Sequence, residues 1–101
     1  MRTMYKKDRL VSYRVHEWMI AELGLGGNEL TVYAMIHEYT VERGEYSDTY
    51  QYLAECTGCH RVTAIKAVKA LAQRGLIKKV DDVEKGYVVK THLSTLRDEV
   101  R

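Results

Sequence analysis

The amino-acid sequence predicts a mainly α-helical domain that ends in a small β-hairpin, an α+β arrangement. Residues 49–75 combine two helical patterns with a glycine-containing turn between them. Residues 76–92 hold two apolar-rich runs around a polar turn, which is typical of a hairpin. A chain of 101 residues can bury one core of modest size, so we expect residues 1–101 to form a single domain.

The residues before this unit predict one short strand and two helices. The alternating segment 11–15 (VSYRV) predicts the strand, and residues 17–23 predict one or two helical turns. We expect a long helix over residues 28–43, with Gly26 at its cap and Gly44 at its stop. Its apolar residues cover nearly the whole circumference, which indicates burial on more than one side. This helix therefore belongs to the core or also lines a dimer interface.

The two helical patterns of residues 49–75 are typical of a helix-turn-helix. The first helix carries YLAE (52–55), a tight turn follows at residues 57–59, and the second helix runs from about His60 to Gly75. The turn glycine and the apolar spacing set the two helices at a steep angle. Apolar residues at i, i+3, i+4 and i+7 of the second helix predict the stripe that faces the core, namely Ala64, Ala67, Val68 and Leu71.

Positive charge gathers on the second helix and the hairpin. The net charge of the whole chain is only +2. Residues 1–59 hold 6 basic and 9 acidic side chains, whereas residues 60–90 hold 8 basic and 3 acidic ones. A local basic face is the footprint of a surface that contacts phosphates. The alternative interpretation is an ordinary charged face in contact with solvent.

A helix-turn-helix presents its second helix to the major groove of double-stranded DNA, and a hairpin that follows this helix forms a wing. We therefore predict binding to double-stranded DNA through the second helix and the wing. The predicted DNA-binding residues are Arg61, Val62, Thr63, Lys66, Lys69, Lys78 and Lys85. Three acidic residues, Asp81, Asp82 and Glu84, offset the positive charge at the tip of the wing. The low net charge and this acidic tip leave open a winged-helix module that binds another protein and not DNA.

Residues 24–77 resemble the winged helix-turn-helix domains at the N-termini of replication-initiator and related proteins of phages and plasmids. The motifs that carry the resemblance are NEL..YA.I, YLAE.TG and L...GLI. The resemblance implies a transcriptional regulator or a replication accessory of a mobile element. These families usually place Ser or Thr before the second helix, where this sequence has His60. Major-groove readers of this size commonly bind as two-fold dimers, so we also expect a homodimer.

The segment Cys56-Thr57-Gly58-Cys59-His60 matches the attachment motif of c-type haem. Haem attachment would need an exported setting, and the N-terminus lacks the apolar region of a signal peptide. A zinc site could use Cys56, Cys59 and His60 or His92, but it needs four ligands, and only one CxxC pair is present. In a helix-turn-helix, Cys59 is instead a small buried hydrophobe. We expect this packing role, with no cofactor and no metal.

Enzymatic activity is not expected, because the sequence has no phosphate-binding glycine loop, HExxH motif or nucleophile elbow. His37 and Glu38 are adjacent on a predicted helix, and we expect a partly exposed polar edge there. No run approaches the roughly 18 apolar residues of a membrane-spanning helix. We therefore expect a cytoplasmic protein without membrane contact.

Overall fold

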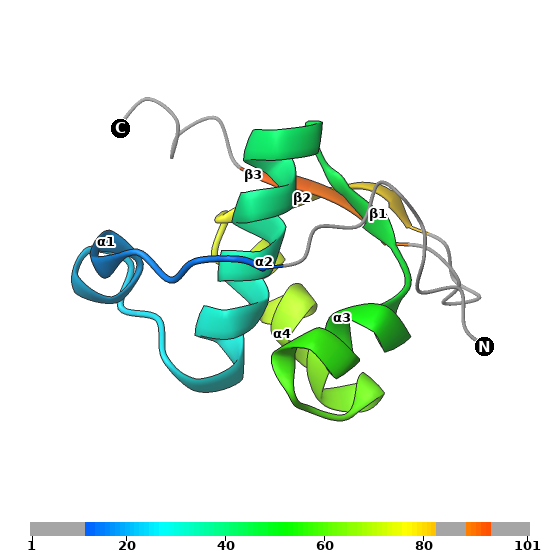
Figure 1. Ribbon diagram of the computed structural model, residues 1–101, viewed down its shortest axis with the longest axis horizontal. Coiled ribbons are helices and arrows are strands. Elements are labelled where there is room, and N and C mark those ends of the chain that lie inside the picture. Colours follow the sequence, from blue (N-terminus) through cyan, green and yellow to red (C-terminus); the bar gives the residue numbers. More distant parts are fainter. Residues whose placement is uncertain (1–11, 83–88, 94–101) are drawn as a thin grey trace.

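The computed structural model describes residues 12–82 and 89–93, whose arrangement is shown in Figure 1. Its elements are α1 (Glu17–Ala21), α2 (Gly27–Arg43), β1 (Tyr46–Asp48), α3 (Tyr50–Thr57), α4 (Arg61–Gln73), β2 (Ile77–Asp82) and β3 (Val89–Leu93). Helix α2 lies in the middle, with α1 on one side and α3 on the other (Figure 1). This is the predicted winged helix-turn-helix of mainly α structure. No helix in the described ranges is long and apolar enough to cross a membrane.

A three-stranded antiparallel sheet forms the wing and its base, in the order β1-β3-β2. Strands β2 and β3 form the predicted hairpin, with Ile77 opposite Leu93 and a bulge between Lys79 and Asp81. Strand β1 pairs with the other edge of β3 and was not predicted from the sequence. The acidic pair Asp81 and Asp82 was expected in the hairpin tip, but both residues extend β2. Strand β2 therefore extends further along the chain than predicted.

The predicted strand at residues 11–15 is wrong for its described part, residues 12–15, which form no strand. These residues instead lead to His16, the N-cap of α1. The Tyr13 hydroxyl donates a hydrogen bond to the carbonyl of Cys56 over 3.3 Å, which holds the segment against α3. An alternating pattern forms a strand only where a neighbouring strand pairs with it, and residues 12–15 pair with none of the three strands of the described sheet.

Helix α2 supplies the centre of the core, as its apolar circumference predicted. Gly26 is its N-cap, and Gly44 ends it with a φ of +94°, which a side chain would disfavour. The residues buried from α2 are Val32, Tyr33, Ala34, Met35, Ile36 and Tyr39. They point to several sides because α2 contacts α1, α3, α4 and the sheet. Most of the apolar surface of α2 is thus used within the domain.

Two local caps define the helix-turn-helix. The Thr49 side-chain oxygen accepts a hydrogen bond from the N–H of Tyr52 over 3.0 Å, so α3 begins earlier than the YLAE motif suggested. Thr57 was placed in the turn, but it is the last residue of α3. Gly58 then reverses the chain with a φ of +76°, and the N–H of Cys59 donates to the carbonyl of Ala54 over 3.0 Å. These bonds satisfy backbone groups that have no hydrogen-bond partner within the helix at the ends of α3.

The predicted stripe of α4 is confirmed, because Ala64, Ala67, Val68 and Leu71 are all buried. They join a core cluster with residues of α2 and α3, and Tyr46 of β1 completes it. Burial raises the pKa of the Tyr46 phenol well above its usual value, with a smaller contribution from nearby Asp48. The neutral Tyr46 hydroxyl donates to the carbonyl of Thr49 over 2.8 Å. This bond ties the sheet to the start of α3.

Gly58 provides a direct test of the turn. A Cβ at Gly58 would meet no nearby atom within 4 Å, so a substitution there introduces backbone strain without a clash. We expect Gly58→Ala to lower the free energy of unfolding by about 1–2 kcal/mol. Gly58→Asn should cost less, because asparagine visits the left-handed region more readily. Urea denaturation measures both, and equal losses for the two variants would contradict the assigned turn geometry.

Candidate nucleic-acid interface

The outer face of α4 lies opposite its buried stripe and consists of Val62, Lys66, Lys69 and Gln73. Successive helix residues advance by about 100°, which brings these four side chains to one side. All four are exposed, and Val62 is 59% exposed although it is apolar. The predicted orientation of Val62, Lys66 and Lys69 is therefore confirmed, whereas contact with DNA stays a prediction.

The first turn of α4 carries Arg61, Val62 and Thr63. Its position is fixed by the Gly58 turn and by His60, the N-cap, whose carbonyl accepts from the N–H of Ala64 over 3.0 Å. His60 makes no side-chain cap bond, unlike the Ser or Thr common at this position. Arg61 is exposed, and Thr63 is partly buried on the flank of α4. No acidic residue stands in this turn, so Arg61 gives it an uncompensated local charge.

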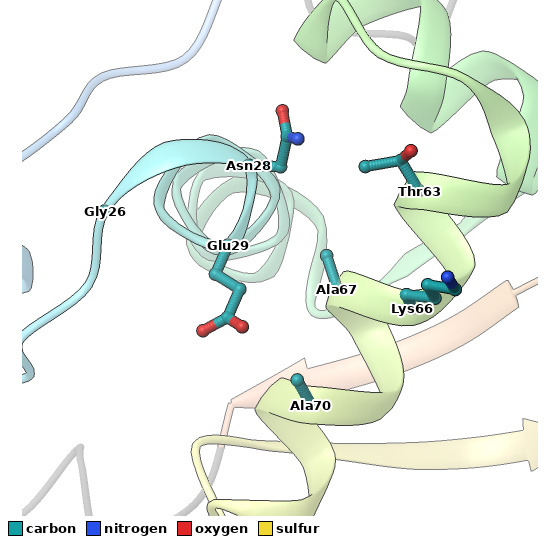
Figure 2. A pocket seen from close by; sticks show the side chains of 7 residues that line it. All are labelled: Gly26, Asn28, Glu29, Thr63, Lys66, Ala67 and Ala70. Carbon is teal, nitrogen blue, oxygen red and sulfur yellow. The ribbon is translucent and has the colours of Figure 1, made fainter.

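A cleft of about 420 Å³ separates α4 from the start of α2. It is lined by Gly26, Asn28, Glu29, Thr63, Lys66, Ala67 and Ala70. Figure 2 shows Thr63, Ala67 and Ala70 along the side of α4 that faces α2, with Asn28 and Glu29 across the gap. The small side chains of Ala67 and Ala70 leave the space open. Two of the predicted DNA-binding residues, Thr63 and Lys66, therefore share a concave surface with α2.

Asn28 is an interface candidate that the sequence analysis missed. Its side chain is exposed at the second position of α2, and it lines the same cleft as Thr63. An amide can donate to a phosphate or to a base edge. Only the tertiary packing of α2 beside α4 reveals this proximity, since no local motif links the two positions in the sequence. Glu29 lines the same cleft and adds an acidic residue to it.

The wing contributes Lys78, which is exposed on β2. Helix α4 is about 20 Å long at 1.5 Å per residue, and Lys78 follows its far end. Lys78 is thus separated from Arg61 and suits a contact with a different stretch of DNA backbone. In the sheet register the acidic residue Asp81 stands opposite the basic residue Lys90. Lys85, another predicted contact, lies outside the described residues.

The CTGCH segment forms the end of α3 and the turn. Cys56 is exposed, and Cys59 is partly buried against the core, less deeply than predicted. The sulfur of Cys59 lies 3.5 Å from the Thr57 hydroxyl oxygen, a contact typical of a packed thiol. Burial raises the pKa of the Tyr52 phenol, and hydrogen bonding to Cys56 adds to this shift. Among the described residues, the set that could hold a metal ion includes neither cysteine.

A comparison with protein families identifies the chain. The model of a helix-turn-helix domain family matches residues 23–77, more than half of the sequence, so the protein belongs to this family. The match includes all of α2, α3 and α4 and ends where β2 begins. No curated protein matches the chain significantly, and no solved structure does. The fold and the family together define a helix-turn-helix protein of the DNA-binding class.

Replacing both cysteines tests their packing role. The variant Cys56→Ser with Cys59→Val retains a small apolar group at the turn and a polar group at the exposed position. We expect it to fold, with a loss of about 1 kcal/mol or less, because volume-conserving changes are tolerated well. Thermal denaturation with and without a chelator measures this. A chelator effect on the wild type that disappears in the variant would instead assign the sulfurs to a metal.

Proposed function

We propose that the protein is a sequence-specific double-stranded DNA-binding protein, acting as a transcriptional regulator or a replication accessory of a mobile element. The observation that carries the proposal is the outer face of α4, which exposes Val62, Lys66 and Lys69 beside Arg61 in a helix-turn-helix fold. Binding would place α4 in the major groove, with the wing against the DNA backbone. The proposal includes no enzymatic activity.

Base contacts and phosphate contacts fall to different residues in this proposal. N-terminal residues of a recognition helix contact base edges, which assigns Arg61, Val62 and Thr63 to sequence readout. Arginine suits the two acceptors of guanine, and an exposed apolar side chain suits the thymine methyl group. Lys66, Lys69 and Lys78 carry point charges and are assigned to phosphates, which set the register. Asn28 joins the interface from α2.

The competing proposal is a module that binds another protein. It is favoured by the exposed apolar side chain of Val62 and by Asp81 and Asp82 in β2, which would repel phosphates. Against it stands the absence of acidic residues from α4, whose first turn and outer face are cationic. A phosphate-binding surface needs that charge, and a protein-binding surface does not. The titration below separates the two proposals.

We also propose that the protein acts as a homodimer in the cytoplasm. Two-fold dimers bind two half-sites about one helical turn apart. The apolar residues of α2 are mostly buried in the domain, so a dimer would use the apolar side chains that remain exposed. Exposed apolar side chains are available at Val15, Ile20 and Val41. The stoichiometry of the DNA complex distinguishes one bound copy from two.

The salt dependence of DNA binding tests the function. If three to five phosphates are neutralised per subunit, log K should fall with log salt at a slope of about −3 to −5. Fluorescence anisotropy with a labelled random-sequence duplex measures this slope. Lys66→Ala should reduce its magnitude by about 1. Arg43→Gln removes a charge at the opposite end of α2 from the cleft and should leave the slope unchanged.

A failure of the wild type to bind any duplex at low salt would refute the DNA-binding proposal and favour the protein-binding one. Equal effects of Lys66→Ala and Arg43→Gln would show that binding depends on net charge alone. In that case α4 would lose its assignment as the DNA-contacting helix.

Val62 is tested by removing the thymine methyl group. Duplexes that the protein binds are first selected from a random pool. The same duplexes are then prepared with uracil in place of thymine, and the two affinities are compared. A buried methyl is worth about 0.8 kcal/mol, so wild-type affinity should fall roughly fourfold for each thymine that Val62 contacts. Val62→Ala should bind more weakly and discriminate less between the two bases. Val41→Ala, which shortens an equally exposed valine on α2, serves as the matched control and should discriminate like the wild type.

A further inference from the structure

A cluster of imidazole, indole and carboxylate side chains lies between α1 and the middle of α2, away from the candidate DNA interface. His16 is the N-cap of α1, Trp18 follows within α1, and His37 and Glu38 come from α2. The His16 and His37 ring centroids are 5.3 Å apart, with an interplanar angle of 69°. The Trp18 ring lies 5.2 Å from that of His37 and 5.7 Å from that of His16. The docking of α1 on α2 thus assembles residues that are distant in the sequence.

Three of these side chains converge on one point. One potential ligand atom each from His16, His37 and Glu38 lies within 4.8 Å of the other two. A zinc–nitrogen bond of about 2.0–2.1 Å places two imidazoles on a shared ion with their ring centres roughly 5 Å apart. The observed 5.3 Å between the two rings agrees with this spacing. Binding of an ion would require side-chain rotations that bring the three ligand atoms closer together.

The residue types fit a particular class of ion. Two imidazoles and one carboxylate form a ligand set that zinc sites use when water completes a tetrahedron. Imidazole also suits cobalt and nickel, whereas magnesium and calcium prefer sites made of oxygen alone. All three residues are partly buried, which shields an ion but leaves it a path to solvent. We propose that His16, His37 and Glu38 bind a divalent transition-metal ion of the zinc type.

In the structure Glu38 forms an ion pair with Arg14, whose Nη2 lies 3.8 Å from Oε2 of Glu38. The Arg14 side chain is 73% exposed, whereas that of Glu38 is 13% exposed. An ion pair with such an exposed partner is weak, so a bound metal displaces Arg14 from the carboxylate. Metal binding then links the segment before α1 directly to α2. This role is structural, and it is independent of the proposed DNA binding.

The intrinsic fluorescence of Trp18 provides the readout, because it is the only tryptophan of the chain and it touches both histidine rings. Untagged protein is titrated with Ni²⁺ or Co²⁺, which quench a nearby indole. We expect saturable quenching at one ion per chain, reversal by excess Zn²⁺, and an upward shift of the melting temperature with Zn²⁺. Cobalt should show visible bands without a thiolate charge-transfer band.

Variants assign the ligands. His37→Gln and Glu38→Gln should each weaken metal binding by at least about tenfold. If His37→Gln does not fold, His16→Gln removes the other imidazole and tests the same site. Arg14→Gln removes the competing cation and should tighten binding. The matched control is Cys56→Ser with Cys59→Val, which removes the thiols of the CTGCH segment and should leave the titration unchanged. Circular dichroism confirms that each variant is folded.

Three results would overturn the site. The first is that Ni²⁺ or Co²⁺ causes no saturable quenching of the tryptophan fluorescence. The second is that His16→Gln and Glu38→Gln fold but bind the metal as tightly as the wild type. The third is that the quenching is lost in the cysteine variant. The last result would move the metal to the turn of the helix-turn-helix. None of these results bears on DNA binding, which the salt titration measures separately.

Discussion

The close packing of α4 against α2 and α3 is the contact on which the remaining structure depends. Ala64 and Ala67 are small enough to let the helices approach, while Val68 and Leu71 fill the space between them. Full burial of a side chain such as Leu71 stabilises the fold by about 1.5–3 kcal/mol. A rotation of α4 by one residue would bury a lysine, so this stripe fixes which side chains face outward. The candidate interface is therefore a direct consequence of the core.

The turn before α4 sets the direction in which that outer face points. The Thr49 cap starts α3, and Gly58 ends it in a conformation that most residues avoid. The angle between the two helices thus depends on this turn and on the buried packing, and not on the exposed side chains. Surface residues such as Val62 and Lys66 are then free to match a target without disturbing the fold.

Much of this fold follows from sequence patterns of short range. The stripe of α4, the glycines that bound α2, and the hairpin all depend on spacing within one element, and each was predicted. Strand β1 was missed because its three residues, Tyr46–Asp48, are too few to show a period of two. The strand predicted at residues 11–15 had that period, but residues 12–15 pair with no strand of the described sheet.

The candidate sites also combine residues that the local sequence predicts with residues that only tertiary contacts bring together. Exposure of Val62, Lys66 and Lys69 could be predicted from the helix period alone. The proximity of Asn28 to α4 and of His16 to His37 depends on which helices touch, and a single sequence gives no information about such contacts. The sequence analysis expected no metal and treated His37 and Glu38 as a polar edge. The structure adds His16 to them, and this third side chain is what makes a metal site chemically plausible.

Chemical-shift mapping tests the central claim most directly, namely that the outer face of α4 is the surface that meets DNA. Uniformly ¹⁵N-labelled protein is titrated with a duplex, and the backbone amide shifts are followed residue by residue. We expect the largest changes at Arg61, Val62, Lys66 and Lys69, with smaller ones at Asn28 and Lys78. Changes concentrated instead on α1 and on the far end of α2, with α4 unaffected, would contradict it.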